Sequence, residues 1–81
     1  MTWEEKKGGR CRYIGAYRVW VIRERFKARG DWLWQVQHCG RHGRLTGCAH
    51  GWNRTLRAGM FVGAAVATML SNMDLAREGA K

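Results

Sequence analysis

The chain has 81 residues, of which 46% are hydrophobic, and its formal net charge is +9. This length allows one domain that hides only about 60% of its unfolded surface, which leaves little room for the shaped pocket that catalysis needs. Fifteen Lys and Arg residues against six Asp and Glu residues favour a polyanionic partner, meaning nucleic acid, an anionic membrane surface or an acidic protein.

The first ten residues are mostly charged or glycine, and Trp3 is their one large apolar side chain. This composition predicts a flexible basic tail over residues 1–10, ahead of a single domain over residues 11–81.

The segment Cys11–Lys27 is expected to carry the first strand. Alternation predicts one set of its side chains in the core and Arg18 and Trp20 on the opposite face. The expected core set is Tyr17, Val19 and Val21. A charged strand end and loop follow, with the cations Arg23, Arg25, Lys27 and Arg29.

The segment Asp31–Cys39 predicts the central strand of the sheet. Tryptophan and valine suit a half-buried pleated surface, so one parity is expected to face the core, with Trp32, Trp34 and Val36. The other parity then places Gln35 and Gln37 on the same face as Arg18.

A glycine-flanked turn after Cys39 precedes a short third strand, expected over Arg44–Ala49. Its alternation predicts Arg44 and Thr46 outward, and Leu45 and Ala49 inward.

The sequence after Ala49 predicts a helix, with Gly51 or Asn53 as its N-cap and Trp52 at its start. Apolar residues recur at helical spacing on more than one face. The sheet covers one of these faces, so a second molecule is the expected cover for the other. The small residues Gly59, Gly63 and Ala67 are expected to let the helix lie close to the tryptophans.

The sequence therefore predicts an α+β fold: a three-stranded antiparallel sheet with one long C-terminal helix packed on one face, forming a homodimer through that helix. The apolar run at residues 58–70 is too short to span a bilayer. An odd number of cysteines and no apparent secretory leader predict a cytoplasmic protein.

Arginine and glutamine are the side chains that read base edges, and tryptophan stacks on unpaired bases. The predicted sheet face therefore suggests DNA binding, although a plain polar surface fits the same residues. Arginines at the helix start suit either a bound phosphate or solvent. The candidate nucleic-acid-binding residues are Arg18, Trp20, Arg23, Arg25, Lys27, Arg29, Gln35, Gln37, Arg44, Arg54 and Arg57.

A zinc site could be drawn from Cys39, His42, Cys48 and His50, although the spacing departs from the usual paired ligands. Buried thiols and solvent-facing imidazoles are the favoured interpretation, so no metal or other cofactor is expected. The six acidic residues are scattered along the chain, and no enzyme is predicted.

The order strand–strand–strand–helix resembles that of short proteins encoded by actinobacterial phages. The resemblance depends on Tyr-Arg-Val-Trp-Val, Trp-Leu-Trp-Gln-Val and the Gly-Trp before an alanine-rich helix, within residues 13–75. Some such proteins act on the host. The order is also similar to the arm-site-binding domains of tyrosine recombinases and to the plant ethylene-response type of DNA-binding domain. Those domains set a three-stranded sheet into the major groove, which implies roles for Arg18, Trp20, Gln35, Gln37 and Arg44.

The function expected from these observations is DNA binding by a small basic phage-type protein, through the sheet face and the loop over residues 23–29. The alternative is an interaction module that binds and inhibits an acidic host protein, with Trp20 and nearby arginines as anchors.

Overall fold

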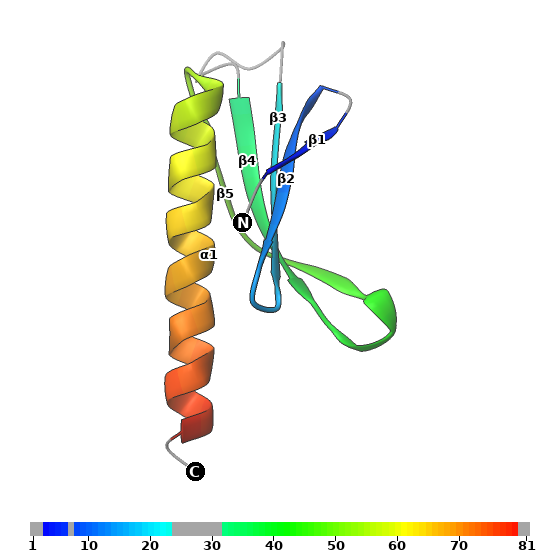
Figure 1. Ribbon diagram of the computed structural model, residues 1–81, viewed down its shortest axis with the longest axis vertical. Coiled ribbons are helices and arrows are strands. Elements are labelled where there is room, and N and C mark those ends of the chain that lie inside the picture. Colours follow the sequence, from blue (N-terminus) through cyan, green and yellow to red (C-terminus); the bar gives the residue numbers. More distant parts are fainter. Residues whose placement is uncertain (1–2, 7, 24–31, 80–81) are drawn as a thin grey trace.

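A computed structural model of the chain describes residues 3–6, 8–23 and 32–79. It is an α+β fold in which five antiparallel strands form one sheet in sequence order and a single helix packs on one face of that sheet (Figure 1). The elements are β1 Glu4–Lys6, β2 Gly9–Ile14, β3 Tyr17–Arg23, β4 Trp32–Cys39, the short 3-10 turn η1 Arg41–Gly43, β5 Leu45–Asn53 and α1 Leu56–Gly79.

The core lies between α1 and the central strands β3 and β4. Its buried members are Tyr17, Val19, Val21, Trp34, Val36 and Ala67. Five of these are strand residues that alternation predicted to face the core, and that prediction is confirmed. Trp32 and Ala49, which were also predicted to face inward, are partly buried against the same cluster.

Small helix residues allow α1 to approach the sheet closely, as the sequence predicted. Gly59 and Gly63 are buried, and a Cβ atom on Gly63 would lie 2.7 Å from Cγ1 of Val19. A side chain at these positions would therefore push the helix away from β3 and β4.

The sheet has five strands where three were predicted, and both extra strands arise in the N-terminal part. The residues predicted as a flexible tail contribute β1 and the first two residues of β2. The segment Cys11–Lys27, expected to hold one strand, contains most of β2 and all of β3, joined by the turn Gly15-Ala16. Gly15 has φ 58, which suits glycine at the first position of a two-residue hairpin turn.

The last strand is longer than predicted and contains a bulge. The β4–β5 pairing shifts between Val36 and Gln37, so that Val36 pairs with Ala49 and Gln37 pairs with Gly47, which leaves Cys48 as an extra residue. The extra residue reverses the alternation on one side of it. Thr46 consequently pairs with His38, on the parity of the helix side, and not on the outward side as predicted.

Two other expectations for this region are wrong. Leu45 is 42% exposed, although it was predicted to face the core. The helix is capped by Thr55, whose Oγ1 accepts a hydrogen bond from the Ala58 amide at 3.1 Å, and not by Gly51 or Asn53. Trp52 and Asn53 belong to β5 instead.

The outward side of α1 is apolar and uncovered within the described chain. Phe61 is 75% exposed there, and Met69 is 56% exposed. By length and composition alone, Leu56–Arg77 would suffice to cross a membrane, and 17% of its most apolar window is buried. Its inward side packs on the sheet, as the fully buried Ala67 shows.

Candidate nucleic-acid interface

The sheet face turned away from α1, called the outer face below, gathers several of the predicted binding residues. Directly paired residues on neighbouring strands point to the same side of a sheet. Arg18 pairs with Gln37, and Trp20 pairs with Gln35, so these four side chains share the outer face. The sequence prediction that placed them together is confirmed.

Further pairings extend the outer face to both sides. Tyr13 of β2 pairs with Arg18, and on β5 His50 pairs with Gln35 while Trp52 pairs with Leu33. The outer face therefore combines aromatic rings, amides and one guanidinium on four adjacent strands.

Ring contacts hold the polar side chains of the outer face in place. The Arg18 guanidinium lies 5.2 Å from the centre of the Trp20 ring, a cation–π contact between residues two apart on β3. On β5, the His50 and Trp52 rings meet edge to face at 5.5 Å. The two tryptophans are half-buried, whereas Tyr13 is 56% exposed.

Three polar atoms of the outer face are buried and have no hydrogen-bond partner among the described residues. They are Nε of Arg18, Oε1 of Gln37 and Nε1 of Trp52. Buried polar atoms are nearly always paired in folded proteins. The hydrogen-bonding capacity of these three atoms is therefore unsatisfied within the described residues.

The bulge in β5 opens a hollow of about 240 Å³ between β4 and β5. Gly47 contributes no side chain to it, and nothing lies within 4 Å of the position that a Cβ atom would take there. In Figure 1 the hairpin formed by the ends of β4 and β5 bends away from α1, as expected for a bulged strand. The lining consists of Gln35, Val36, Gln37, Gly47, Cys48, Ala49 and His50.

The remaining predicted arginines that the structure describes lie around the outer face and not on it. Arg44 directly precedes β5 and Arg54 directly follows it, and both are exposed. Arg57 is exposed in the first turn of α1. Arg23 pairs with Trp32 on the helix side of the sheet, and its guanidinium lies 5.9 Å from that ring. Arg25, Lys27 and Arg29 lie outside the described residues.

The outer face is accordingly less basic than the sequence suggested. Arg10 and Arg12 of β2 pair with Val21 and Val19, which places both cations on the helix side. Lys6 shares the outer side with Glu4, and the two form an ion pair at 2.9 Å. Arg18 thus carries the uncompensated charge of the outer face within the described chain, and the cations at both ends of β5 flank it.

Sequence reasoning missed Tyr13, His50 and Trp52 as members of the outer face. Tyr13 shares its parity with Tyr17 along the chain, and only the Gly15-Ala16 turn places the two on opposite faces. Recognising that glycine as a hairpin turn would have revealed Tyr13. His50 and Trp52 were assigned to a possible zinc set and to the helix start, because the strand was expected to end at Ala49.

The zinc candidates are Cys39, His42, Cys48 and His50. Over residues 3–6, 8–23 and 32–79, no three His, Cys, Asp or Glu side chains gather closely enough to hold a metal ion. Cys39 pairs with Leu45, whereas His50 pairs with Gln35 further along the hairpin.

Comparison of the chain with protein-family models, with curated proteins and with solved structures finds no match.

Proposed function

We propose that the protein binds nucleic acid, with DNA as the leading candidate, through the outer face of its sheet. The observation that supports this most directly is the grouping of Arg18, Trp20, Gln35 and Gln37 on one face, which no other described element covers. These residue types hydrogen-bond to base edges and stack on base faces.

The surrounding cations complete the proposed interface. Arg44 and Arg54 stand at the two ends of β5, outside the aromatic and amide surface. Phosphates supply most of the affinity in such complexes, whereas base contacts add selectivity. We assign phosphate contacts to these flanking arginines and base contacts to the outer face. The loop cations Arg25, Lys27 and Arg29 stay part of the proposal as sequence-based candidates.

The test is binding of fluorescent DNA oligonucleotides, measured by anisotropy over a range of salt concentrations. The affinity should fall steeply as salt rises, because binding releases counterions from the phosphates. Arg18→Ala should weaken binding by about tenfold, since charged groups at such contacts contribute about 1–3 kcal/mol each. Arg77→Ala is the control of equal charge change, because Arg77 lies on α1 away from the outer face.

Absence of DNA binding at about 100 mM salt would contradict the proposal. Capture of an acidic protein from nuclease-treated lysate, together with such an absence, would favour the alternative interaction module. Equal losses for Arg18→Ala and Arg77→Ala would show that net charge, and not the outer face, determines binding.

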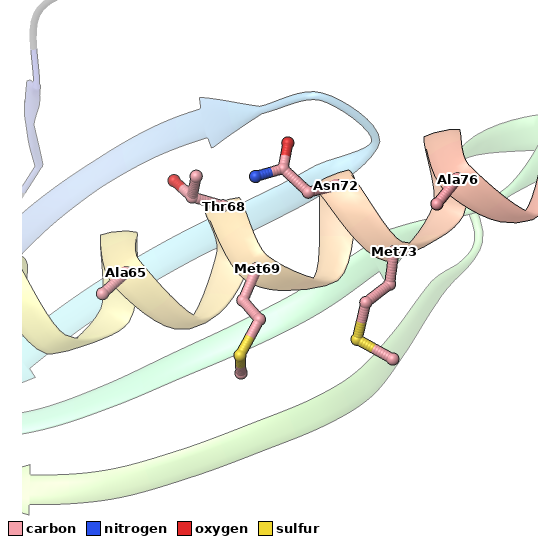
Figure 2. Close-up of a pocket in the computed structure, with 6 residues that line it drawn as sticks. All are labelled: Ala65, Thr68, Met69, Asn72, Met73 and Ala76. Carbon is pink, nitrogen blue, oxygen red and sulfur yellow. The ribbon is translucent and has the colours of Figure 1, made fainter.

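We further propose that two copies associate through the outward side of α1. Figure 2 shows six residues of this side, with the Met69 and Met73 side chains projecting together and Thr68 and Asn72 projecting elsewhere. An antiparallel pair of these helices, centred between Thr68 and Met69, would set the large Phe61 against the small Ala76 of the other copy. Matching of large and small side chains under two-fold symmetry suits a homodimer.

The source of the chain and its compartment stay predictions. The resemblance to short phage proteins implies a bacterial host cytoplasm, and a role in host interaction remains part of that expectation.

A further inference from the structure

The width of the sheet favours one class of nucleic acid over another. Neighbouring strands lie about 4.8 Å apart, so the four strands β2–β5 span about 14 Å, whereas the major groove of B-DNA is only about 12 Å wide. The four strands that carry the outer face therefore exceed what a groove admits. A sheet with exposed aromatic residues instead suits single strands, whose bases are free to stack.

The hollow at the bulge has the chemistry to hold one such base. Gln35 and Gln37 border it from β4 and His50 borders it from β5, so its rim offers amide donors, amide acceptors and an imidazole. Oε1 of Gln37 is buried there without a hydrogen-bond partner in the described chain. At about 240 Å³ the hollow is smaller than the roughly 300–1,000 Å³ of sites that enclose drug-sized ligands. A single planar base is a ligand of suitable size.

The backbone around the hollow gives independent support. A bulge re-aims side chains and often lies beside a functional site, and glycine inside a strand often marks close approach of a ligand. Both features occur together at Gly47 and Cys48. Trp20 on β3 is paired with Gln35, and Trp52 on β5 follows His50 by two residues, so both rings lie near the Gln35 and His50 end of the hollow.

We propose that the hollow between β4 and β5 receives one unpaired base of a single-stranded nucleic acid, while neighbouring bases stack on Trp20 and Trp52. This inference rests on the proposed function and names its substrate class. The amides of Gln35 and Gln37 hydrogen-bond to the edge of the inserted base, and the flanking arginines contact the phosphates.

The decisive variant is Gly47→Val, which fills the hollow. A Cβ atom at Gly47 meets nothing within 4 Å, and its φ is not in the left-handed region, so the variant is expected to fold. Thr46→Val is the matched control, because Thr46 neighbours Gly47 on β5 but lies on the opposite parity. Circular dichroism and thermal unfolding verify that both variants fold.

The probes are an oligodeoxyadenylate of about ten nucleotides, within the usual range of single-strand sites, and an abasic deoxyribose-phosphate oligomer of equal length and charge. The wild-type protein should bind the adenylate at least about tenfold more tightly than the abasic oligomer, which lacks stacking bases. Gly47→Val should lose a large part of this preference, whereas its affinity for the abasic oligomer should stay unchanged. Thr46→Val should bind both probes like the wild type.

A duplex that contains the same adenylate strand should bind more weakly than the free strand, because its bases are already stacked and paired. The inference is overturned if Gly47→Val keeps the wild-type preference for bases, or if the duplex binds as tightly as the single strand. If either result is obtained while the wild-type protein still binds DNA in a salt-dependent manner, the inference fails but the proposed function is retained. Failure of the wild type to bind any of the three probes overturns both proposals.

Discussion

Tyr17, the first residue of β3, connects that strand to the C-terminal part of α1. Its hydroxyl donates a hydrogen bond to Oδ2 of Asp74 at 2.6 Å, across 57 positions of the chain. The same ring meets His38 edge to face at 5.2 Å. The bond to Asp74, followed by burial, raises the pKa of Tyr17 to about 12. This hydrogen bond therefore ties the C-terminal part of the helix to β3.

Tyr17→Phe should lower the free energy of unfolding at neutral pH by about 1–2 kcal/mol, because Asp74 loses a partner. A pKa that is higher in the folded chain than in the unfolded chain contributes stability below the unfolded value, here 10.0. That contribution disappears as the pH rises toward about 12. Urea unfolding of both proteins across this pH range measures it.

The difference in unfolding free energy between wild type and Tyr17→Phe cancels the titration of groups that do not contact Tyr17. It should be constant between neutral pH and pH 10 and shrink above pH 10. A difference that is absent at neutral pH, or that grows with pH, would contradict the assigned role of the hydroxyl.

At the scale of elements, the close contact of α1 with β3 depends on glycine residues, which have no side chain, as much as on the apolar side chains that pack there. Gly63 faces Val19, which is fully buried and has no room to move. Just before the first residue of β3, the turn at Gly15 lies against the helix, where a Cβ atom would overlap Ser71. The helix position is therefore set by two glycines on different elements.

Gly63→Ala should destabilise the protein by about 1–3 kcal/mol through overpacking, even though alanine favours helix by up to about 1 kcal/mol. Gly47→Ala is the control, because a Cβ atom there meets nothing within 4 Å. Urea midpoints of the two variants give the comparison. A Gly63→Ala variant as stable as the wild type would show that α1 shifts freely over the sheet.

How far the sequence determined these elements depended on the strength of local alternation. The indoles and valine of Trp32–Cys39 made β4 and its core face evident, and the prediction that Trp20 and Gln35 share the other face followed from it. In β1, Glu4–Lys6 is exposed throughout and shows no alternation. The bulge at Cys48 was unpredictable for another reason: one extra residue reverses parity without changing composition.

At the scale of the whole molecule, the two sides of the sheet–helix sandwich differ in chemistry. The outer face presents aromatic rings and amides, whereas the outward side of α1 presents Phe61, Met69 and Met73, all more than half exposed. A pair of copies joined through α1 would keep both outer faces open. Proposed association and proposed binding are therefore compatible in one assembly.

Met69→Glu should convert the proposed dimer to a monomer, because the two-fold axis would bring two buried carboxylates together. Sedimentation velocity at several protein concentrations measures the change. Leu45→Glu is the matched control, since it replaces an exposed apolar residue at the hairpin turn, away from α1. A wild-type chain that sediments as a monomer at all concentrations would contradict the proposed association.

Because α1 follows all five strands along the chain, the ribosome synthesises the strands before the helix that covers them. Until the helix docks, the apolar face that holds Val19, Val21 and Val36 is exposed to solvent. Partly folded chains with such exposed apolar surface are prone to aggregation. A chain whose translation ends within α1 would contain all five strands but would lack the helix that covers their apolar face. The exposed apolar face would make that truncated chain a target for chaperones and proteases.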